Sequence, residues 1–123
     1  MFPIQQECFP LILEGRDILA SDRTGSGKTL AYTLPILEKI YQNEPNPASI
    51  RTPRFLILSP TRELALQVSN EIRKFAGSYK VATLYGGSSV SEQIRELKRG
   101  AAIIVATPGR LMDLMDKGVV DLR

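Results

Sequence analysis

The sequence Thr24-Gly25-Ser26-Gly27-Lys28-Thr29 follows a short apolar run, Ile18-Leu19-Ala20, and precedes a helical pattern over residues 28–41. The order of strand, glycine-containing loop and helix is the context that a phosphate-binding loop requires. Gly25 and Gly27 let the backbone turn and approach a ligand closely, because no Cβ is in the way. The exposed N–H groups of such a loop and of the helix start favour anions.

The last two residues of this loop carry its chemistry. Lys28 can reach terminal phosphates, and the Thr29 hydroxyl can bind Mg²⁺, so both are candidate catalytic residues. The pattern G-x-x-x-x-G-K-[ST] begins with glycine, whereas this chain has Asp22 there. A carboxylate beside a triphosphate is unfavourable unless it points away or pairs with Arg23. The alternative is a glycine turn before an ordinary amphipathic helix, and the preceding strand favours the phosphate loop.

Length and composition indicate one soluble globular domain. The chain has 123 residues, of which 43% are hydrophobic and 24% charged, and this suffices for a modest core. No apolar run approaches the roughly 20 residues of a membrane span, and no signal peptide is expected. The net charge of +3 permits a polyanionic partner without establishing one.

The cysteine and histidine counts exclude several kinds of site. Cys8 is the only cysteine, so no intrachain disulfide can form, in keeping with a reducing compartment. Its apolar neighbours predict a small core residue. The chain has no histidine, which excludes histidine catalysis, histidine metal sites and a zinc centre.

The periodicity predicts an initial helix followed by strands and helices in alternation. Pro10 should interrupt the first helix, and Pro35 should kink the second near Ala31. A proline-rich segment, 42–53, is interpreted as a surface loop within one domain. The expected strands are 17–21, 55–58, 81–85 and 102–106, and the expected helices are 3–14, 28–41, 62–76, 91–99 and 110–117.

Alternation with short connections predicts an α/β fold, a parallel sheet flanked by helices. The run 55–58 is apolar throughout, as in a buried parallel strand. Each later helix has an expected inner stripe: Leu64, Val68, Ile72 and Phe75 in the first, Val90, Ile94 and Leu97 in the second, and Leu111, Leu114 and Met115 in the third.

Two strand-to-helix junctions have the same pattern, Ser59-Pro60-Thr61-Arg62 and Thr107-Pro108-Gly109-Arg110. Ser59 and Thr107 suit the N-cap position, and the prolines suit the first helical position. Each helix start, with its arginine, is a candidate phosphate site, although a well-capped helix explains either junction alone.

Ligands of parallel sheets bind beyond the carboxyl ends of the strands. The loop at 24–29, the two junctions and Gly86-Gly87 all follow expected strand ends, so all four should share one edge. One nucleotide cannot occupy them all, and a nucleic acid strand is the economical second ligand. Gly86-Gly87 would let a ligand backbone approach closely. The alternative interpretation is a plain turn.

At this point the sequence resembles the DEAD-box family of ATP-dependent RNA helicases. The matching segments are Pro3-Ile4-Gln5 with Pro10 and Gly15-Arg16-Asp17 (Q motif), Thr24 to Thr29 (motif I), Pro60 to Gln67 (motif Ia), Gly86-Gly87 (GG) and Thr107 to Arg110 (motif Ib). Their order and spacing agree over the whole chain.

The resemblance implies an N-terminal RecA-like P-loop NTPase lobe that uses ATP and Mg²⁺. It implies adenine recognition by Gln5, and triphosphate binding by Thr24, Gly25, Ser26, Gly27, Lys28 and Thr29, with Thr29 on the metal. It implies RNA-backbone contacts by Pro60, Thr61, Arg62, Gly86, Gly87, Thr107, Pro108, Gly109 and Arg110. The implied partners are RNA and a second RecA-like lobe, without a membrane, in the nucleus, nucleolus or cytoplasm.

The sequence departs from the family at Asp22, where alanine is usual, and no D-E-A-D or S-A-T motif is present. We expect an incomplete lobe that stops before D-E-A-D, does not hydrolyse ATP or unwind RNA alone, and is marginally stable because the strand at 17–20 lies at an open edge. The alternatives are a non-enzymatic RNA- or nucleotide-binding module, another P-loop enzyme, and DNA in place of RNA.

Overall fold

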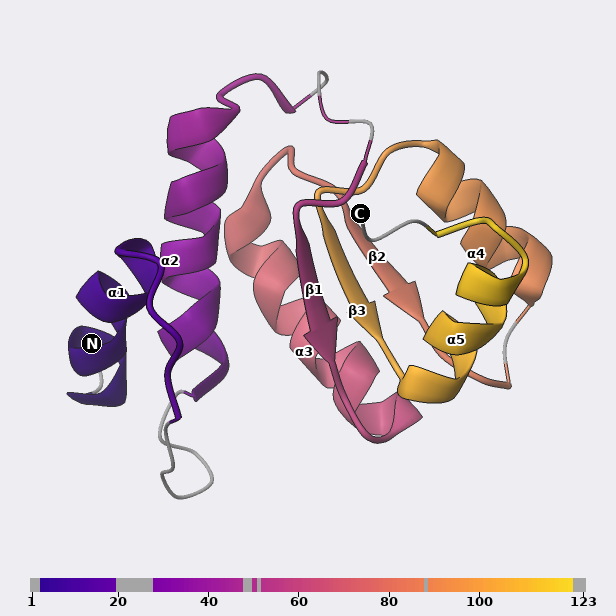
Figure 1. Cartoon of the computed structure of the whole chain (residues 1–123), viewed down its shortest axis with the longest axis horizontal. Coiled ribbons are helices and arrows are strands. Elements are labelled where there is room, and N and C mark those ends of the chain that lie inside the picture. The colour runs from indigo at the N-terminus through magenta and orange to yellow at the C-terminus, as the bar shows by residue number, and fades with distance from the viewer. Residues whose placement is uncertain (1–2, 20–27, 48–49, 51, 88, 121–123) are drawn as a thin grey trace. The chain divides into compact units, whose positions relative to one another are not determined.

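The computed structural model describes residues 3–19, 28–47, 50, 52–87 and 89–120. These residues form helices and strands in the order α1 (Pro3–Leu13), α2 (Lys28–Asn43), β1 (Phe55–Leu58), α3 (Arg62–Ala76), β2 (Val81–Leu84), α4 (Val90–Lys98), β3 (Ile103–Ala106) and α5 (Pro108–Asp116) (Figure 1). The α/β prediction is confirmed. Contacts divide the chain into two compact units, Met1–Pro45 and Asn46–Arg123.

In the first unit, α1 and α2 pack against each other (Figure 1). Ile4 and Cys8 of α1 form an apolar cluster with Ala31 of α2, and Ile12 packs at its border. Cys8 is therefore the small core residue that the sequence predicts. The buried residues of α2 are Ala31, Thr33, Pro35 and Ile40, whereas Tyr41 near its end is exposed.

The course of α1 corrects the predicted break at Pro10, because the helix runs through this residue to Leu13. Packing of its apolar face offsets the backbone hydrogen bond that proline cannot make. The helix ends within one residue of the predicted bound at 14, and Gly15 follows with φ 85°. The Gly15 and Arg16 N–H groups donate to the carbonyls of Ile12 and Leu11 at 2.9 and 3.1 Å, which is a Schellman cap.

The strand predicted at 17–21 is not present in its described part, since residues 16–19 form no strand and 20–21 lie outside the described residues. A strand needs a hydrogen-bonding neighbour, and the described sheet offers none to this segment. Within the described part of the chain, the edge strands of the sheet are β1 and β2. The unit boundary falls inside the predicted loop 42–53, and the single-domain interpretation stays a prediction, as does a kink at Pro35.

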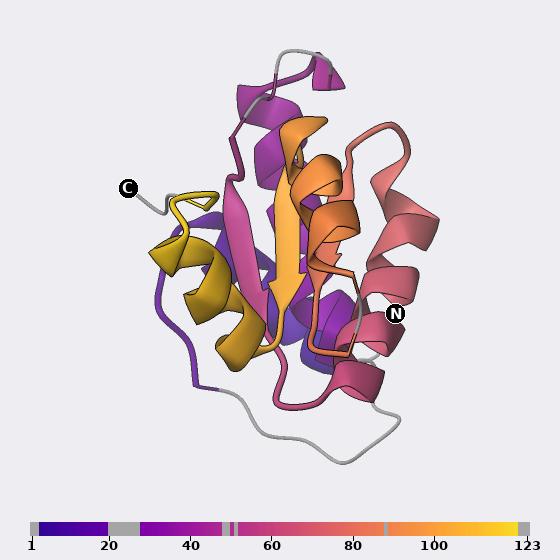
Figure 2. The ribbon, with the colours of Figure 1, turned by 90° about the vertical axis from the view of Figure 1, so that its right-hand side faces the viewer.

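The second unit contains a parallel sheet in the order β1-β3-β2 (Figure 2). Residues of β3 are all buried, because this central strand is covered on both faces and paired along both edges. The predicted strands at 55–58, 81–85 and 102–106 are confirmed to within one residue. The run 55–58 is less buried than predicted, because it is an edge strand whose last residue, Leu58, is exposed.

The two faces of the sheet carry different helices (Figures 1 and 2). Successive strand residues point to opposite faces. Even-numbered residues such as Leu84, Ile104 and Ala106 pack with Leu111 and Leu114 of α5, and the predicted α4 stripe of Val90, Ile94 and Leu97 packs against the same core. On the other face, Thr83 donates a hydrogen bond of 2.6 Å to Ser69 of α3.

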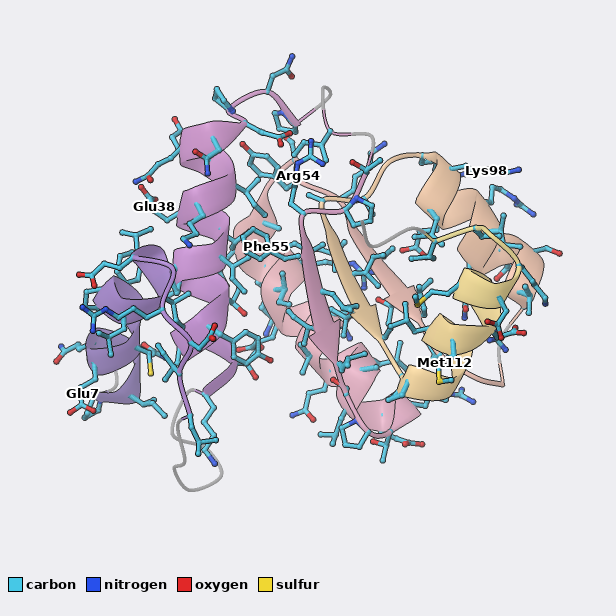
Figure 3. All side chains as sticks on the ribbon, viewed as in Figure 1. Glu7, Glu38, Arg54, Phe55, Lys98 and Met112 are labelled. Carbon is cyan, nitrogen blue, oxygen red and sulfur yellow. The ribbon has the colours of Figure 1, made fainter. Side chains whose placement is uncertain are left out.

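The inner face of α3 differs from the predicted stripe. Leu64 and Phe75 are 43% and 51% exposed, and the buried residues are Ala65, Ser69, Ile72 and Ala76. These recur at i, i+4, i+7 and i+11, so the helix lies on the sheet through small side chains that allow a close approach. Met115 of α5, predicted to be inward, is also exposed, as is its neighbour Met112 (Figure 3).

Side chains from two helices cover the outer edge of β2. Arg73 donates to the Val81 carbonyl at 2.9 Å, Glu96 accepts from the Thr83 N–H, and Gln93 donates to the Tyr85 carbonyl at 2.9 Å. Residues 81, 83 and 85 are alternate, so these are the backbone groups that point away from β3. Residues of β2 are consequently all buried although the strand has one neighbour.

Glu96 is half-buried, and its Oε1 lies 3.6 Å from Nη2 of Arg73. Burial raises the pKa of the Glu96 carboxyl above its ordinary value of 4.5, and the Arg73 charge and the Thr83 N–H oppose the rise. A raised folded-state pKa means that protonation favours the folded state, so this contribution is lost as the pH rises through that value.

We therefore expect wild-type stability, relative to Glu96→Gln, to fall as the pH rises from about 4 to about 7. Glutamine keeps an acceptor for Thr83 and removes the titration. Thermal melts of both proteins across this range measure the difference, with Glu71→Gln, whose carboxylate pairs with Lys74 on the same helix, as the control. A wild type that becomes more stable than Glu96→Gln as the pH rises would show that its partners favour the charged carboxylate.

Candidate nucleic-acid interface

The carboxyl ends of the three strands meet at one edge of the sheet. Leu58 and Leu84 both align with Ala106 in the parallel register. Segments 59–62, 85–87 and 107–110 follow these ends directly, so the structure brings together three of the four segments that the sequence placed on a common edge. Side chains and helix starts from separate parts of the chain therefore face the same ligand space.

Two backbone hydrogen bonds tie the three strand ends to one another. The Ser59 N–H donates to the Ala106 carbonyl at 2.9 Å, and the Thr107 N–H donates to the Leu84 carbonyl at 2.9 Å. Each bond continues the parallel ladder one residue beyond its strand. The first residues of both junctions are thus held by the sheet, and the Thr107 carbonyl also accepts from the Leu111 N–H of α5 at 3.1 Å.

The junction after β1 differs from its prediction. Ser59 is buried and pairs with β3, so it is not the N-cap, and Pro60 is not the first helical residue. The N-cap of α3 is Thr61, whose hydroxyl accepts from the Leu64 N–H at 3.2 Å. The extra ladder bond keeps Ser59 in the sheet, so the cap moves to Thr61, while the helix itself begins at Arg62 as expected.

The junction after β3 follows its prediction more closely. Thr107 is the N-cap of α5 and Pro108 is the first helical residue. The Thr107 hydroxyl makes no cap hydrogen bond and lies 3.5 Å from the Leu84 carbonyl. The first turn contains no acidic residue, whereas that of α3 contains Glu63. The start of α5 is therefore the more favourable of the two for an anion.

The two arginines consequently occupy different helical positions. Arg62 is the first residue of α3, and Arg110 is the third of α5. Arg62 is exposed, and its guanidinium carbon lies 5.5 Å from the centroid of the Tyr85 ring. This is within the range of a cation–π contact, which holds the charge over the turn after β2.

Gly87 lies directly beside Arg62. Its φ is 80°, a left-handed conformation that favours glycine. A Cβ at this position would lie 3.3 Å from Nη1 of Arg62, whereas a Cβ at Gly86 would meet nothing within 4 Å. Of the two glycines, Gly87 is the one that the local geometry requires.

Arg110 is held by a residue that the sequence analysis did not select. Its Nη1 donates to Oε1 of Gln93 at 2.9 Å, while Nε2 of Gln93 donates to the Tyr85 carbonyl at 2.9 Å. The Gln93 side chain is 3% exposed. One signal was available, because residue 93 falls on the same helical face as Val90 and Leu97, where a polar residue needs partners.

The nucleotide-binding predictions fall in the first unit and are only partly described. Thr24, Gly25, Ser26 and Gly27 lie outside the described residues, as does Asp22. Lys28 is the first residue of α2 and is exposed, and Thr29 follows it, half-buried. Gln5 lies among the buried residues of α1. Burial raises the pKa of the Tyr32 phenol, and a side-chain hydrogen bond with Thr29 opposes the rise.

Other kinds of site find no support in the described part of the chain. No group of three or more acidic, cysteine or histidine residues there could hold a metal, and no helix within it is long and apolar enough to cross a membrane. An open pocket of about 450 Å³, lined by Arg73, Lys80 and Arg99 among others, lies at the start of β2. Since it lies away from the carboxyl ends of the strands, we do not assign it to this interface.

Comparisons with known proteins agree with this arrangement. The family model described as DEAD/DEAH box helicase matches residues 2–123. The chain is 52% identical over 115 residues to the pre-mRNA-processing ATP-dependent RNA helicase PRP5 of Lodderomyces elongisporus, covering 92% of this chain and 12% of that protein. It is 44% identical over 122 residues to the mitochondrial DEAD-box ATP-dependent RNA helicase 9 of Arabidopsis thaliana, covering 99% and 20%.

Solved structures show the same similarity. The yeast DEAD-box splicing factor Prp28 matches with a TM-score of 0.91 and 38% identity, over 99% of this chain and 30% of that one. A hypothetical ATP-dependent RNA helicase from Sulfolobus tokodaii matches with a TM-score of 0.81 and 42% identity, over 98% and 33%. The chain thus spans a third or less of each of these proteins.

The contrast between the two glycines gives a stability test. We expect Gly87→Ala to lower the free energy of unfolding by about 1–2 kcal/mol, because alanine in the left-handed region is strained and its Cβ crowds Arg62. Gly86→Ala is the matched control and should change stability by less than about 0.5 kcal/mol. Urea unfolding of both variants measures this, and equal effects would contradict the geometric assignment.

Proposed function

The chain belongs to the DEAD/DEAH box helicase family, and we propose that it is the ATP- and RNA-binding lobe of a DEAD-box ATP-dependent RNA helicase. The observation that carries the proposal is the shared edge at the carboxyl ends of β1, β2 and β3. There the helix start at Pro108, the guanidinium of Arg62 and the glycine turn at 86–87 face one ligand space. A chain of phosphates is the ligand that needs several such groups in a row.

RNA binding through its backbone fits the chemistry of these groups. The residues proposed to contact RNA are Pro60, Thr61, Arg62, Gly86, Gly87, Thr107, Pro108, Gly109 and Arg110. The Gly109 and Arg110 N–H groups lie in the first turn of α5, where helix N–H groups have no intrahelical acceptor. Arg62 adds a fixed positive charge held against Tyr85. Such contacts position a strand without reading its sequence.

ATP is proposed to bind at Thr24 to Thr29, with the Gln5 amide on adenine. Lys28 is exposed at the start of α2 and Thr29 is beside it, so an ammonium, a hydroxyl and the N–H groups of a helix start lie together. This donor set fits a terminal phosphate with Mg²⁺, for which the Thr29 hydroxyl would be one oxygen ligand. When bound, Mg²⁺ neutralises charge that develops on the phosphates.

In the longer protein, this lobe would act with a second RecA-like lobe on the same ATP and RNA. We propose local, ATP-driven opening of RNA duplexes or remodelling of RNA–protein complexes, in the nucleus, nucleolus or cytoplasm. The lobe supplies two ligand sites in one chain, and phosphoryl transfer depends on positioned charges. Coupling of ATP use to the opening of RNA requires ATP and RNA to be bound at the same time.

Separate losses of the two ligands test this proposal. Lys28→Ala should weaken ATP binding by at least about tenfold while leaving RNA binding unchanged, and Arg62→Ala should do the reverse, because a charge-assisted hydrogen bond contributes about 1.5–3 kcal/mol. Arg62→Ala should also reduce the slope of log affinity against log salt by about 0.7 for single-stranded RNA. Lys74→Ala, at the other end of α3, is the control cation. Titrations of labelled RNA and ATP measure both effects. A Lys28→Ala variant that loses RNA binding would contradict the assignment of two separate sites.

The 123 residues on their own are expected to bind ATP without turning it over. The predicted motifs in these residues supply phosphate and hydroxyl contacts but no carboxylate pair to hold Mg²⁺ and orient water, which phosphoryl transfer needs. Phosphate release by the purified chain, with Lys28→Ala as the background control, measures this. Turnover above that background would show that the acidic pair is dispensable or supplied from elsewhere in the chain.

A further inference from the structure

We infer that Gln93 is a positioning residue that fixes Arg110 and the Tyr85–Gly87 turn at one spacing for the RNA backbone. The inference rests on the proposed function, because it takes Arg110 and the turn as RNA contacts. Gln93 itself lies below the surface and does not reach the ligand space, since its side chain is 3% exposed.

The geometry of Gln93 links three elements through one rigid group. Its amide oxygen accepts from Nη1 of Arg110 in α5 at 2.9 Å, and its amide nitrogen donates to the Tyr85 carbonyl at the end of β2 at 2.9 Å. The oxygen and nitrogen belong to one planar amide, so neither bond can lengthen without disturbing the other. A shift of Arg110 is therefore transmitted to the residue that begins the glycine turn.

The backbone of Gln93 is itself held in place. Val90, Ile94 and Leu97 of α4 pack against the core that β2, β3 and α5 share. The side chain leaves this anchored helix and carries the amide to the strand end. Because a buried amide that loses its partners is unfavourable, the two bonds favour one placement of the amide.

The uncharged character of Gln93 matters as much as its reach. An amide oxygen orients a guanidinium while leaving its positive charge intact, whereas a carboxylate at the same place would form an ion pair. A phosphate is attracted by the net charge that remains. A glutamine therefore aims Arg110 without neutralising it.

Three substitutions test the inference on the full chain. Gln93→Met removes both hydrogen bonds at similar volume, and Gln93→Glu keeps an acceptor for Arg110 but neutralises it. Ser69→Ala is the structural control, because it removes a different buried hydrogen bond to β2, the one from Thr83 at 2.6 Å, without touching Arg110. Affinity for single-stranded RNA, its salt slope and thermal melting are measured for each.

We expect Gln93→Met to weaken RNA binding about tenfold, and to weaken it much less in an Arg110→Ala background, as for two residues that act as a unit. Gln93→Glu should remain folded yet lower the salt slope by about 0.7, the value for one lost phosphate contact. Ser69→Ala should lower the melting temperature and leave RNA affinity unchanged.

Distinct outcomes overturn the inference and the proposed function. If Arg110→Ala and Arg62→Ala leave RNA binding unchanged, the proposed function fails. If these weaken binding but Gln93→Met does not, or if its effect adds fully to that of Arg110→Ala, the positioning role fails. If Gln93→Met does not fold, Gln93→Glu decides: an unchanged affinity and salt slope would overturn the inference.

Discussion

The hydrogen-bond ladder of β3 is the constraint on which the proposed RNA edge depends. This strand is buried along its whole length and pairs in parallel on both sides. Its last carbonyl receives the Ser59 N–H, and the residue after it, Thr107, donates to Leu84. The starts of three segments far apart in sequence are therefore set within one hydrogen-bond network. Changes in β3 would move all of them together.

Most of the second unit could be predicted from the sequence, because short apolar runs mark its strands and apolar residues at helical spacing mark its helices. The buried face of α3 could not be predicted in this way. Leu64 and Phe75 are larger and more apolar than Ala65 and Ser69, yet the small residues are buried. The distance between helix and sheet decides which face fits, and that distance is a tertiary property. The strand at 17–21 was predicted from local apolar residues alone, whereas a strand forms only where a neighbouring strand pairs with it.

The candidate site shows the same division. The common edge followed from parallel topology and was predicted, and its three described segments do lie together. The two junctions share a pattern in sequence, but Ser59 pairs with β3 and the cap of α3 is Thr61, so Arg62 is the first residue of its helix and Arg110 the third of its own. Gln93 was missed because its partners, Tyr85 and Arg110, lie 8 and 17 residues away along the chain. The roles of the nucleotide and RNA residues remain predictions from the family.

The side chains of Arg73, Gln93 and Glu96 along β2 give the sheet a direction of growth. They occupy the donors and acceptors that another strand would use, whereas no described strand pairs with the outer edge of β1. A strand that joins this sheet, from the same polypeptide or from another copy, therefore cannot pair with β2 unless it displaces these side chains. Oligomers of this lobe that form by addition of a strand are therefore not expected at the edge of β2.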